Sequence, residues 1–188
     1  MLKLLKKIKR RIGALLGKPD APKVLSPEDY YRSKGVLIGK NVSLIEPINF
    51  GSEPYLISIG DNTTVSFDVA FVTHDAATRV LRNLPGGNRD TGFYGEIVIG
   101  KNSFIGCRST ILPNVHIGDS TIIGAGSLVT RDIPSNVVAV GNPCRVICTL
   151  DEYIKKNRES FFYIQSLGQD DKRRYLMDYF KRKDMNEV

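Results

Sequence analysis

The chain has 188 residues, of which 41% are hydrophobic and 25% are charged, a composition that argues against global disorder. Its formal net charge of +7 comes entirely from residues 1–18, which hold seven basic side chains and no acid, whereas the remainder carries 20 basic and 20 acidic side chains. The basicity therefore belongs to one short segment and does not predict that the body of the chain binds nucleic acid.

The three cysteines and two histidines limit the chemistry that the chain can support. Cys107, Cys144 and Cys148 form no Cys-x-x-Cys pair, are too few for a disulfide framework, and with two histidines offer no zinc-ligand spacing. No segment approaches the ~18 continuous apolar residues that span a bilayer, and the N-terminus is too basic and too interrupted for a secretory signal. We expect no metal and a cytoplasmic protein.

Residues 1–18 are predicted to form a basic amphipathic helix, mainly over residues 1–17. Apolar side chains recur at three- and four-residue spacing, opposite the lysines and arginines: Leu2, Leu5, Ile8, Ile12, Leu15 and Leu16. The apolar face would pack on the protein itself or on a second subunit, or the helix would make a peripheral membrane contact on anionic lipid. Nucleic acid is not expected, because no aromatic side chains are interleaved with the basic ones.

From residue 36 the apolar pattern repeats every six residues. These guide positions form three runs: Ile38, Leu44 and Phe50; Ile59, Val65 and Phe71; and Ile99, Ile105, Ile111, Ile117, Ile123 and Val129. A small or branched side chain stands four residues after many of them: Thr63, Ser103, Ser109, Val115, Thr121 and Ser127. Glycine directly follows the guide position in seven of the twelve cases, which permits a turn that a side chain would obstruct.

This spacing predicts a mainly β fold, a parallel β-helix over residues 36–147. Side chains six apart on extended chain face the same way, so the guide positions point into one interior. Three six-residue faces close a triangular coil, and each coil buries its apolar side chains only against neighbouring coils. A β-sandwich would need six consecutive guide positions to stay in register by chance.

The remaining segments lie around this array. Residues 51–58 lengthen one coil, and residues 75–96 leave the pattern as a protruding loop, whose length indicates a functional role. Residues 19–35 are predicted to be a linker. Residues 148–188 are predicted to be a C-terminal helical segment that caps the open coil or contacts a partner, with helices over 150–166 and 170–183.

The segment from Ile97 to Ile147 resembles the hexapeptide-repeat acyltransferases. The likeness is greatest to the branch with maltose, galactoside and streptogramin acetyltransferases and many capsule or lipopolysaccharide O-acetyltransferases. Three stretches carry it: Ile123-Gly124-Ala125-Gly126-Ser127, Val129-Thr130-Arg131-Asp132-Ile133-Pro134, and Gly141-Asn142-Pro143. The resemblance implies a left-handed coil, a homotrimer, and acetyl-CoA lying along the groove between neighbouring coils.

His74 is the candidate catalytic residue, because it opens the long loop where the family carries its catalytic histidine. Transfer of an acetyl group to a hydroxyl requires removal of the hydroxyl proton, and neutral imidazole suits that task near neutral pH. A histidine at a strand end can also be purely structural. The other histidine, His116, is predicted to point outward from the coil. Candidates to orient His74 or to line the acceptor site are Glu46, Asn49, Asp75, Asp90 and Glu96.

The resemblance also implies a set of cofactor-binding residues. Ala125 and Gly126 match positions where the family backbone approaches the pantetheine arm, and Cys107 matches a position near the thioester. Thr130 and Arg131 match positions beside the CoA tail. Arg145 matches a phosphate-facing position, a role that a guanidinium group suits because it binds phosphate bidentately.

We therefore expect an acetyl-CoA-dependent O-acetyltransferase that acts on a sugar hydroxyl, in surface polysaccharide biosynthesis. One alternative is an antibiotic acetyltransferase. An alternative of another class is a β-helix scaffold without catalysis, which predicts no acetyl-CoA binding. A metalloenzyme of the carbonic-anhydrase type needs three histidine ligands, and this chain has two.

Overall fold

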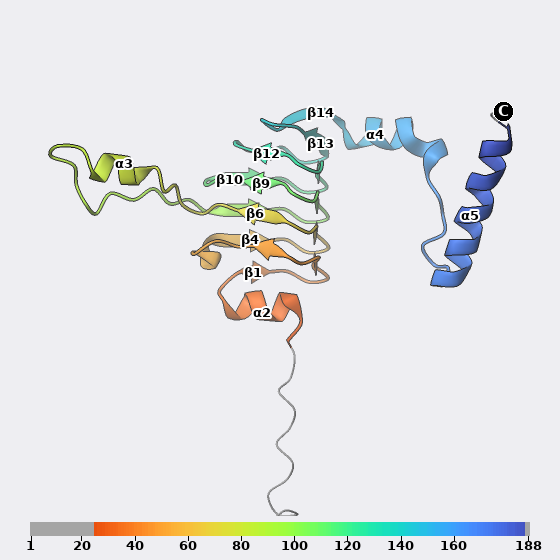
Figure 1. Ribbon diagram of the computed structural model, residues 1–188, viewed down its shortest axis with the longest axis horizontal. Helices are drawn as coiled ribbons and strands as arrows, with labels where there is room; N and C mark the ends of the chain where they lie inside the picture. The colour runs from red at the N-terminus through yellow and green to blue at the C-terminus, as the bar shows by residue number, and fades with distance from the viewer. Residues whose placement is uncertain (1–24, 187–188) are drawn as a thin grey trace, which may run out of the picture.

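A computed structural model describes residues 25–186 of the chain, with side chains to residue 181. The predicted amphipathic helix of residues 1–17 lies outside the described residues. The body is a left-handed parallel β-helix, with a loop projecting from one side and an arm of helices from the other (Figure 1). The predicted fold class is thereby confirmed for the described part of the chain.

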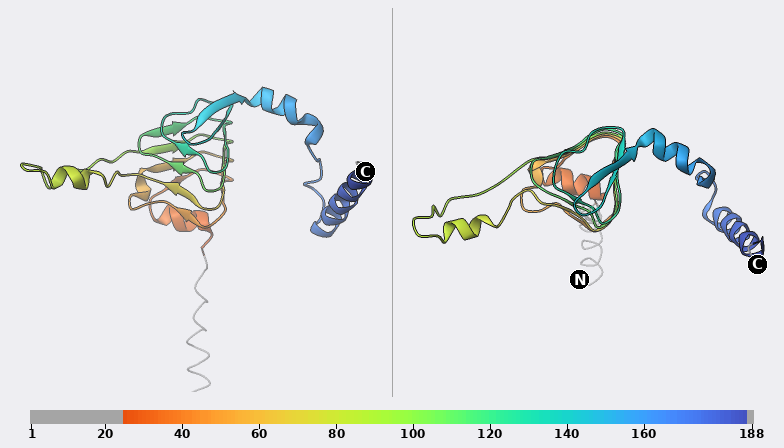
Figure 2. Two further views of the ribbon diagram at one scale, coloured as in Figure 1. Left: turned by 45° about the horizontal axis from the view of Figure 1, so that its top comes forward. Right: turned by 90° about the horizontal axis from the view of Figure 1, so that it is seen from above.

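Three sheets, parallel except for the last strand of the second, form the faces of a triangular prism, which is seen end-on in Figure 2. The first face holds β1 (Leu37–Ile38), β4 (Ile57–Ile59), β7 (Ile97–Ile99) and β10 (Val115–Ile117). The second face holds β2 (Ser43–Leu44), β5 (Thr64–Val65), β8 (Phe104–Ile105), β11 (Ile122–Ile123), β13 (Val137–Val140) and β14 (Arg145–Thr149). The third face holds β3 (Ile48–Asn49), β6 (Val69–Phe71), β9 (Thr110–Ile111) and β12 (Leu128–Val129).

The guide positions fill the interior of the prism. Eleven of the twelve are buried, and Ile38, in the first coil, is partly buried against the same cluster. Successive guide residues on one face pair directly, as Val65 does with Leu44 below and Ile105 above. The predicted inward orientation of the guide positions is therefore confirmed, and each coil buries its aliphatic side chains only because neighbouring coils cover it.

Small polar side chains also point inward and join the coils. Ser103 Oγ donates to Gly118 O at 3.0 Å and accepts from Thr121 N–H at 3.2 Å, while Ser103 N–H donates to Thr63 Oγ1 at 3.1 Å. Every buried side-chain nitrogen or oxygen in the described part of the chain has a partner. These hydroxyl groups satisfy backbone groups at the turns, where the strand ladders are interrupted.

Two of the prism's three corners carry the candidate site residues. The Gly126 corner, between the second and third faces, contains residues 45–47, 66–68, 106–108 and 124–126. The His74 corner, between the third and first faces, contains residues 50–56, 72–96, 112–114 and 130–132. The strands of the third face separate the two corners in every coil (Figure 2).

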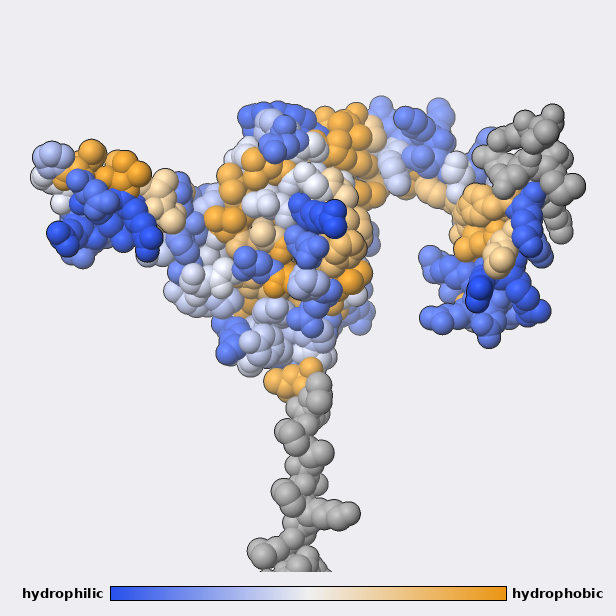
Figure 3. All heavy atoms as spheres, viewed as in Figure 1, coloured by the Kyte–Doolittle hydropathy of each residue, from blue (hydrophilic) through white to orange (hydrophobic). Residues whose placement is uncertain are grey.

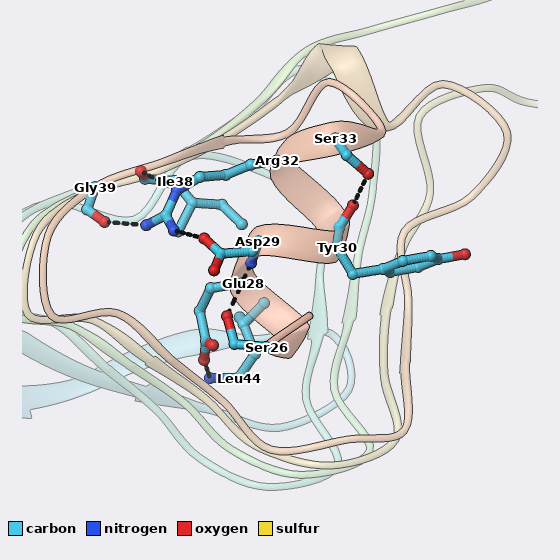
Figure 4. A network of polar contacts seen from close by, with 9 residues as sticks. All are labelled: Ser26, Glu28, Asp29, Tyr30, Arg32, Ser33, Ile38, Gly39 and Leu44. Carbon is cyan, nitrogen blue, oxygen red and sulfur yellow. Dashed lines mark hydrogen bonds and ion pairs between the residues drawn. The ribbon is translucent and has the colours of Figure 1, made fainter. Parts of the chain in front are cut away.

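Residues that we expected to belong to a linker form helix α2 (Pro27–Ser33), which lies against the first coil (Figure 4). Arg32 donates from Nη2 to Gly39 O at 2.9 Å and pairs with Asp29 at 2.9 Å, while Leu44 N–H donates to the Glu28 carboxylate at 3.0 Å. Ser26 caps the helix through Asp29 N–H. The linker prediction was wrong although local signals mark the start of this helix: a serine N-cap, a proline at the first helical position and two acids in the first turn.

The predicted loop leaves the prism at the His74 corner. Its two legs are joined by hydrogen bonds from Asp75 N–H to Phe93 O and from Gly95 N–H to Thr73 O, both 2.9 Å long. It contains the short helix α3 (Thr78–Arg82) near its tip (Figure 1). The stem thus holds His74 at the base of the loop.

The C-terminal segment begins with β14, which runs antiparallel to β13, and continues as α4 (Leu150–Asn157) and α5 (Gln169–Asn186). The helix expected over 150–166 ends at residue 157, because a 3-10 turn η2 (Arg158–Ser160) and an extended stretch follow. Among the described residues, no helix has the length and apolar character needed to cross a bilayer. The arm stands away from the prism (Figure 2).

Candidate active site

His74 lies directly after β6, where the chain leaves the third face to enter the loop. Its backbone forms a bridge with Tyr94 on the returning leg, and the two rings are 6.0 Å apart at an interplanar angle of 50°. The side chain is 38% exposed. The imidazole is therefore held by a rigid strand end and a paired loop stem, yet it remains accessible to a ligand.

The acid that contacts His74 is Glu53. Its Oε2 lies 2.8 Å from His74 Nδ1 and also accepts a hydrogen bond of 2.7 Å from Thr73 Oγ1. The hydrogen bonds from His74 and Thr73 hold the pKa of Glu53 below its usual range. Glu53 belongs to the lengthened turn of the coil below, which contains the 3-10 turn η1 (Pro54–Leu56).

This pair fixes the chemistry that the imidazole can perform. An ionised Glu53 has only acceptor sites, so the hydrogen bond between them requires a proton on Nδ1 of His74. Neutral His74 then has Nε2 free of a proton and able to accept one. The arrangement is that of a general base with an anionic partner that orients its ring and stabilises the protonated form.

An open hollow of about 200 Å³ adjoins His74 under the loop. The imidazole, the ring of Tyr94 and the Arg79 and Arg82 side chains of α3 line it, together with Thr78 and Phe93. Tyr94 and Phe93 are 57% and 47% exposed. Aromatic faces next to hydrogen-bonding groups provide the mixed surface that small polar ligands require.

The five residues predicted to orient His74 or to line the acceptor site have other contacts. Asp75 lines the hollow, and its Oδ1 accepts from Ala77 N–H at 2.8 Å. Glu96 lies 3.3 Å from His116 Nε2, and Asp90 is exposed in the loop. Asn49 Oδ1 accepts from Gly51 N–H within the turn that leads to Glu53. Glu46 lies at the Gly126 corner, 3.5 Å from the Tyr31 hydroxyl.

None of these five is the acid bonded to His74. One feature of the sequence pointed to Glu53, namely the length of the coil that contains it. The lowest full coil is lengthened, and its strands pair with the next coil at an offset of 21 residues, the same separation as between Glu53 and His74. Register alone therefore places Glu53 directly below His74.

The candidate cofactor residues fall into two groups. Cys107, Ala125 and Gly126 stack at the Gly126 corner, where Gly126 N–H donates to Cys107 O at 2.8 Å. Gly126 has a φ of +69° and open space where a side chain would stand, so the corner presents bare backbone. That surface can accept an extended chain of a ligand against the coil.

The other candidate cofactor residues lie higher on the prism. Thr130 and Arg131 are exposed at the His74 corner, directly after β12 and two coils above β6. Arg145 is exposed at the start of β14, and its Nη1 donates to Cys144 O at 2.7 Å. The remaining guanidinium donors of Arg145 are available to an anion.

Within one chain, His74 and Gly126 are on different corners, separated by the width of the third face. The single chain thus places the candidate base and the candidate cofactor corner apart. His116 is exposed, as predicted, and lies on β10 of the first face. Across residues 25–181, no group of three or more His, Cys, Asp or Glu side chains could hold a metal ion.

Comparisons with known proteins match this architecture. The family model described as bacterial transferase hexapeptide (six repeats) matches residues 96–131. Protein CapG of Staphylococcus aureus is 38% identical over 161 residues, which cover 85% of this chain and 92% of that protein. Galactoside O-acetyltransferase of Escherichia coli (strain K12) is 39% identical over 115 residues, which cover 60% of this chain and 51% of that protein. The solved maltose O-acetyltransferase of Clostridium difficile 630 is 29% identical, with a TM-score of 0.50 over 76% of this chain and 84% of that one.

Proposed function

The chain belongs to the bacterial hexapeptide-repeat transferases and is an acyltransferase, and on that basis we propose that it transfers an acetyl group from acetyl-CoA to a sugar hydroxyl, with His74 as the general base. The observation that carries the proposal is the hydrogen bond between His74 and Glu53, together with the hollow that His74 lines. The names of the galactoside and maltose O-acetyltransferases support a sugar as the acceptor.

His74 performs the proton transfer in this proposal. As the acceptor oxygen attacks the thioester carbonyl carbon, His74 Nε2 takes the hydroxyl proton, and Glu53 stabilises the imidazolium through Nδ1–H. When the C–S bond breaks, His74 returns the proton to the departing thiolate sulfur. Acetyl-CoA supplies the activated acyl group. A positioned base of this kind contributes roughly 10²–10⁴-fold to the rate.

The co-substrate would lie along the Gly126 corner. The bare backbone at Gly126 and the short side chain of Ala125 leave room for a pantetheine arm, with Cys107 one coil below. Arg145 would hold the charged end, together with Arg131 and Thr130 from the His74 corner of a neighbouring subunit, because an exposed guanidinium group can bind phosphate bidentately. The observed bare corner fits the group, and we propose these six residues as its binding site.

We propose that the active unit is a homotrimer in which the two corners come from neighbouring subunits. Two observations support this. The single chain separates His74 from Gly126, and the loop and the C-terminal arm extend away from the prism with apolar side chains on their surfaces (Figure 3). Val80 and Leu84 of the loop are 65% and 53% exposed, and Phe180 of the arm is 50% exposed. Packing against a second subunit would remove such side chains from water.

We also propose that the acceptor belongs to surface polysaccharide biosynthesis, which follows from the resemblance of residues 97–147 to capsule and lipopolysaccharide O-acetyltransferases. The enzyme would then work in the cytoplasm, and residues 1–17 would bring it to anionic lipid. Co-sedimentation with vesicles of anionic phospholipid tests this part. Binding that weakens with salt supports it, and absence of binding at low salt contradicts it.

The test of the transferase proposal is release of free CoA thiol from acetyl-CoA across a panel of monosaccharides, sugar phosphates, nucleotide sugars and oligosaccharides. The wild-type protein is compared with His74→Ala. Turnover with one class of acceptor, lost in the variant while acetyl-CoA binding by calorimetry persists, is the expected result. A protein that neither turns over nor binds acetyl-CoA would instead be a scaffold.

A further inference from the structure

The hollow beside His74 contains two arginines that the proposed proton transfer does not use. Arg79 and Arg82 both come from α3, three residues apart, and so project from the same side of the helix. Arg79 is exposed and Arg82 is half-buried. They line the same cavity as the imidazole, so a ligand that reaches His74 from the hollow also meets guanidinium groups.

The charge of these arginines is not neutralised by the protein. Within residues 25–181, neither Arg79 nor Arg82 forms an ion pair; the salt bridges there involve Arg32, His74, Arg108, His116 and Arg174. Asp75 is the acid that shares the hollow, and one of its oxygens is occupied by Ala77 N–H. Two positive groups therefore face one negative group beside the imidazole of His74.

Arg82 is also held in position before any ligand arrives. Its Nε donates a 2.6 Å hydrogen bond to Thr91 O on the returning leg of the loop. This bond fixes the plane of the guanidinium and leaves its terminal Nη groups for other acceptors. A pre-positioned arginine loses little side-chain entropy on binding, and its planar donors match the spacing of carboxylate or phosphate oxygens.

We infer that the acceptor sugar carries an anionic oxygen group, a phosphate ester or a carboxylate, which Arg79 and Arg82 bind while Tyr94 contacts the sugar ring and His74 takes the hydroxyl proton. This inference rests on the proposed transferase function and adds the class of acceptor. A neutral sugar would leave two guanidinium groups with the single carboxylate of Asp75 in a hollow of about 200 Å³, and would displace their water without supplying a second counter-charge. The small volume suits one sugar ring with its charged substituent.

The experiment compares matched acceptors that differ in charge: a hexose, the same hexose as a 1-phosphate or 6-phosphate, and the corresponding uronic acid. Values of kcat/KM are measured for the wild type and for Arg79→Gln, Arg82→Gln and Arg82→Lys. Arg89→Gln is the control, because Arg89 lies in the same loop but does not line the hollow. Comparison of the hexose phosphate with the uronic acid identifies which anion is preferred.

We expect the wild type to prefer a charged acceptor over its neutral counterpart by at least tenfold in kcat/KM. Arg79→Gln and Arg82→Gln should each lose about 10- to 100-fold on the charged acceptor, the usual effect of removing a hydrogen bond to a charged group. The value for the neutral acceptor should change much less, so that the preference for the charged acceptor falls in both variants. The KM for acetyl-CoA should stay at the wild-type value. Arg82→Lys should recover part of the loss, and added salt should lower the preference.

Two other outcomes separate this inference from the function on which it rests. Turnover of neutral sugars with no preference for charge, and no effect of Arg79→Gln or Arg82→Gln, overturns the inference and leaves the transferase intact. If no acceptor is turned over, binding of the hexose 1-phosphate and the hexose is measured by ligand-observed NMR. Equal binding of the two, unchanged in both variants, also overturns the inference.

Discussion

The carboxylate of Glu53 lies one coil below His74, with its Oε2 at 2.8 Å from Nδ1 of the ring. Thr73, next to His74 in sequence, donates to the same oxygen at 2.7 Å. The residues that follow β6 and the lengthened turn of the coil below thus meet at Oε2 of Glu53. Both donors lower the pKa of Glu53, so this carboxylate is ionised at neutral pH and holds the ring in one tautomer.

Replacing Glu53 with Gln should lower kcat on the order of 10²-fold, because the imidazolium loses its anionic partner and the ring loses its fixed tautomer. The KM for acetyl-CoA should not change. The acid limb of the pH profile of kcat/KM should move to lower pH, since a neighbouring negative charge favours the protonated ring. Steady-state kinetics across pH 5–9 provide all three values.

Glu53→Asp and Thr73→Val should give intermediate rates, since each keeps part of the contact. Glu159→Gln is the control, because it replaces an exposed acid in the C-terminal arm. This variant should keep the wild-type pH profile. A purely structural role for Glu53 would lower the melting temperature without moving the pH profile, and that result would contradict its assignment as the positioning residue.

The separation of His74 and Ala125 on different corners leads to a test by subunit mixing. His74→Ala removes the base, and Ala125→Trp fills the open Gly126 corner, so each variant alone should lose most activity. The two variants, each with its own tag, are co-expressed, and trimers that carry both tags are isolated. These mixed trimers should have about a third of the wild-type rate, because one of their three interfaces pairs an intact His74 with an intact Ala125.

Size-exclusion chromatography and circular dichroism of each single variant establish that both fold and assemble. A mixed trimer with no more activity than the two parents would mean that each chain uses its own His74 and its own Gly126 corner. That result would contradict the shared site.

Ser103→Ala should destabilise the protein by about 1–3 kcal/mol, because Gly118 O and Thr121 N–H lose their partner inside the prism. Ser43→Ala, a matched change on an exposed position of β2 in the first coil, should stay within about 0.5 kcal/mol. Urea unfolding at one protomer concentration measures both values. Equal effects of the two changes would show that the internal hydroxyl contributes no more than a surface one.

The contact between Glu28 and Leu44 should make stability depend on pH. Burial raises the pKa of Glu28, but hydrogen bonds from its own backbone, from Leu44 N–H and from Ser26 outweigh burial and place the pKa below its usual value. A lowered pKa in the folded state contributes stability above the unfolded value near 4.3, and this contribution is lost as pH falls through the folded value.

Glu28→Gln should therefore cost about 1 kcal/mol at pH 7 and progressively less below about pH 4.5. Thermal unfolding of both proteins between pH 3 and pH 7 tests this. A difference that stays constant over the range would show that the charge of Glu28 does not contribute.

The repeat array was predictable because its information is local. Side chains six residues apart face the same way on any extended chain, and glycine and small residues mark the corners. The guide residues Ile105, Ile111 and Ile123 are fully buried, as their spacing predicted. The start of helix α2 has local signals in Ser26 and Pro27, which the linker prediction did not use. Its position against the first coil is not local, because Arg32 and Glu28 bind backbone groups of residues 39 and 44.

The spacing of the guide positions was enough to predict the β-helix and its loop, and the family resemblance then singled out His74 as the candidate base. The acid that meets His74 and the side chains that surround it depend on how the coils pair in the folded chain. Asp75 is its neighbour in sequence, yet Glu53 is its partner, because the lengthened coil shifts the pairing to 21 residues and brings the two side chains into contact. Contacts between coils depend on register across the whole turn, and that register is a property of the folded chain.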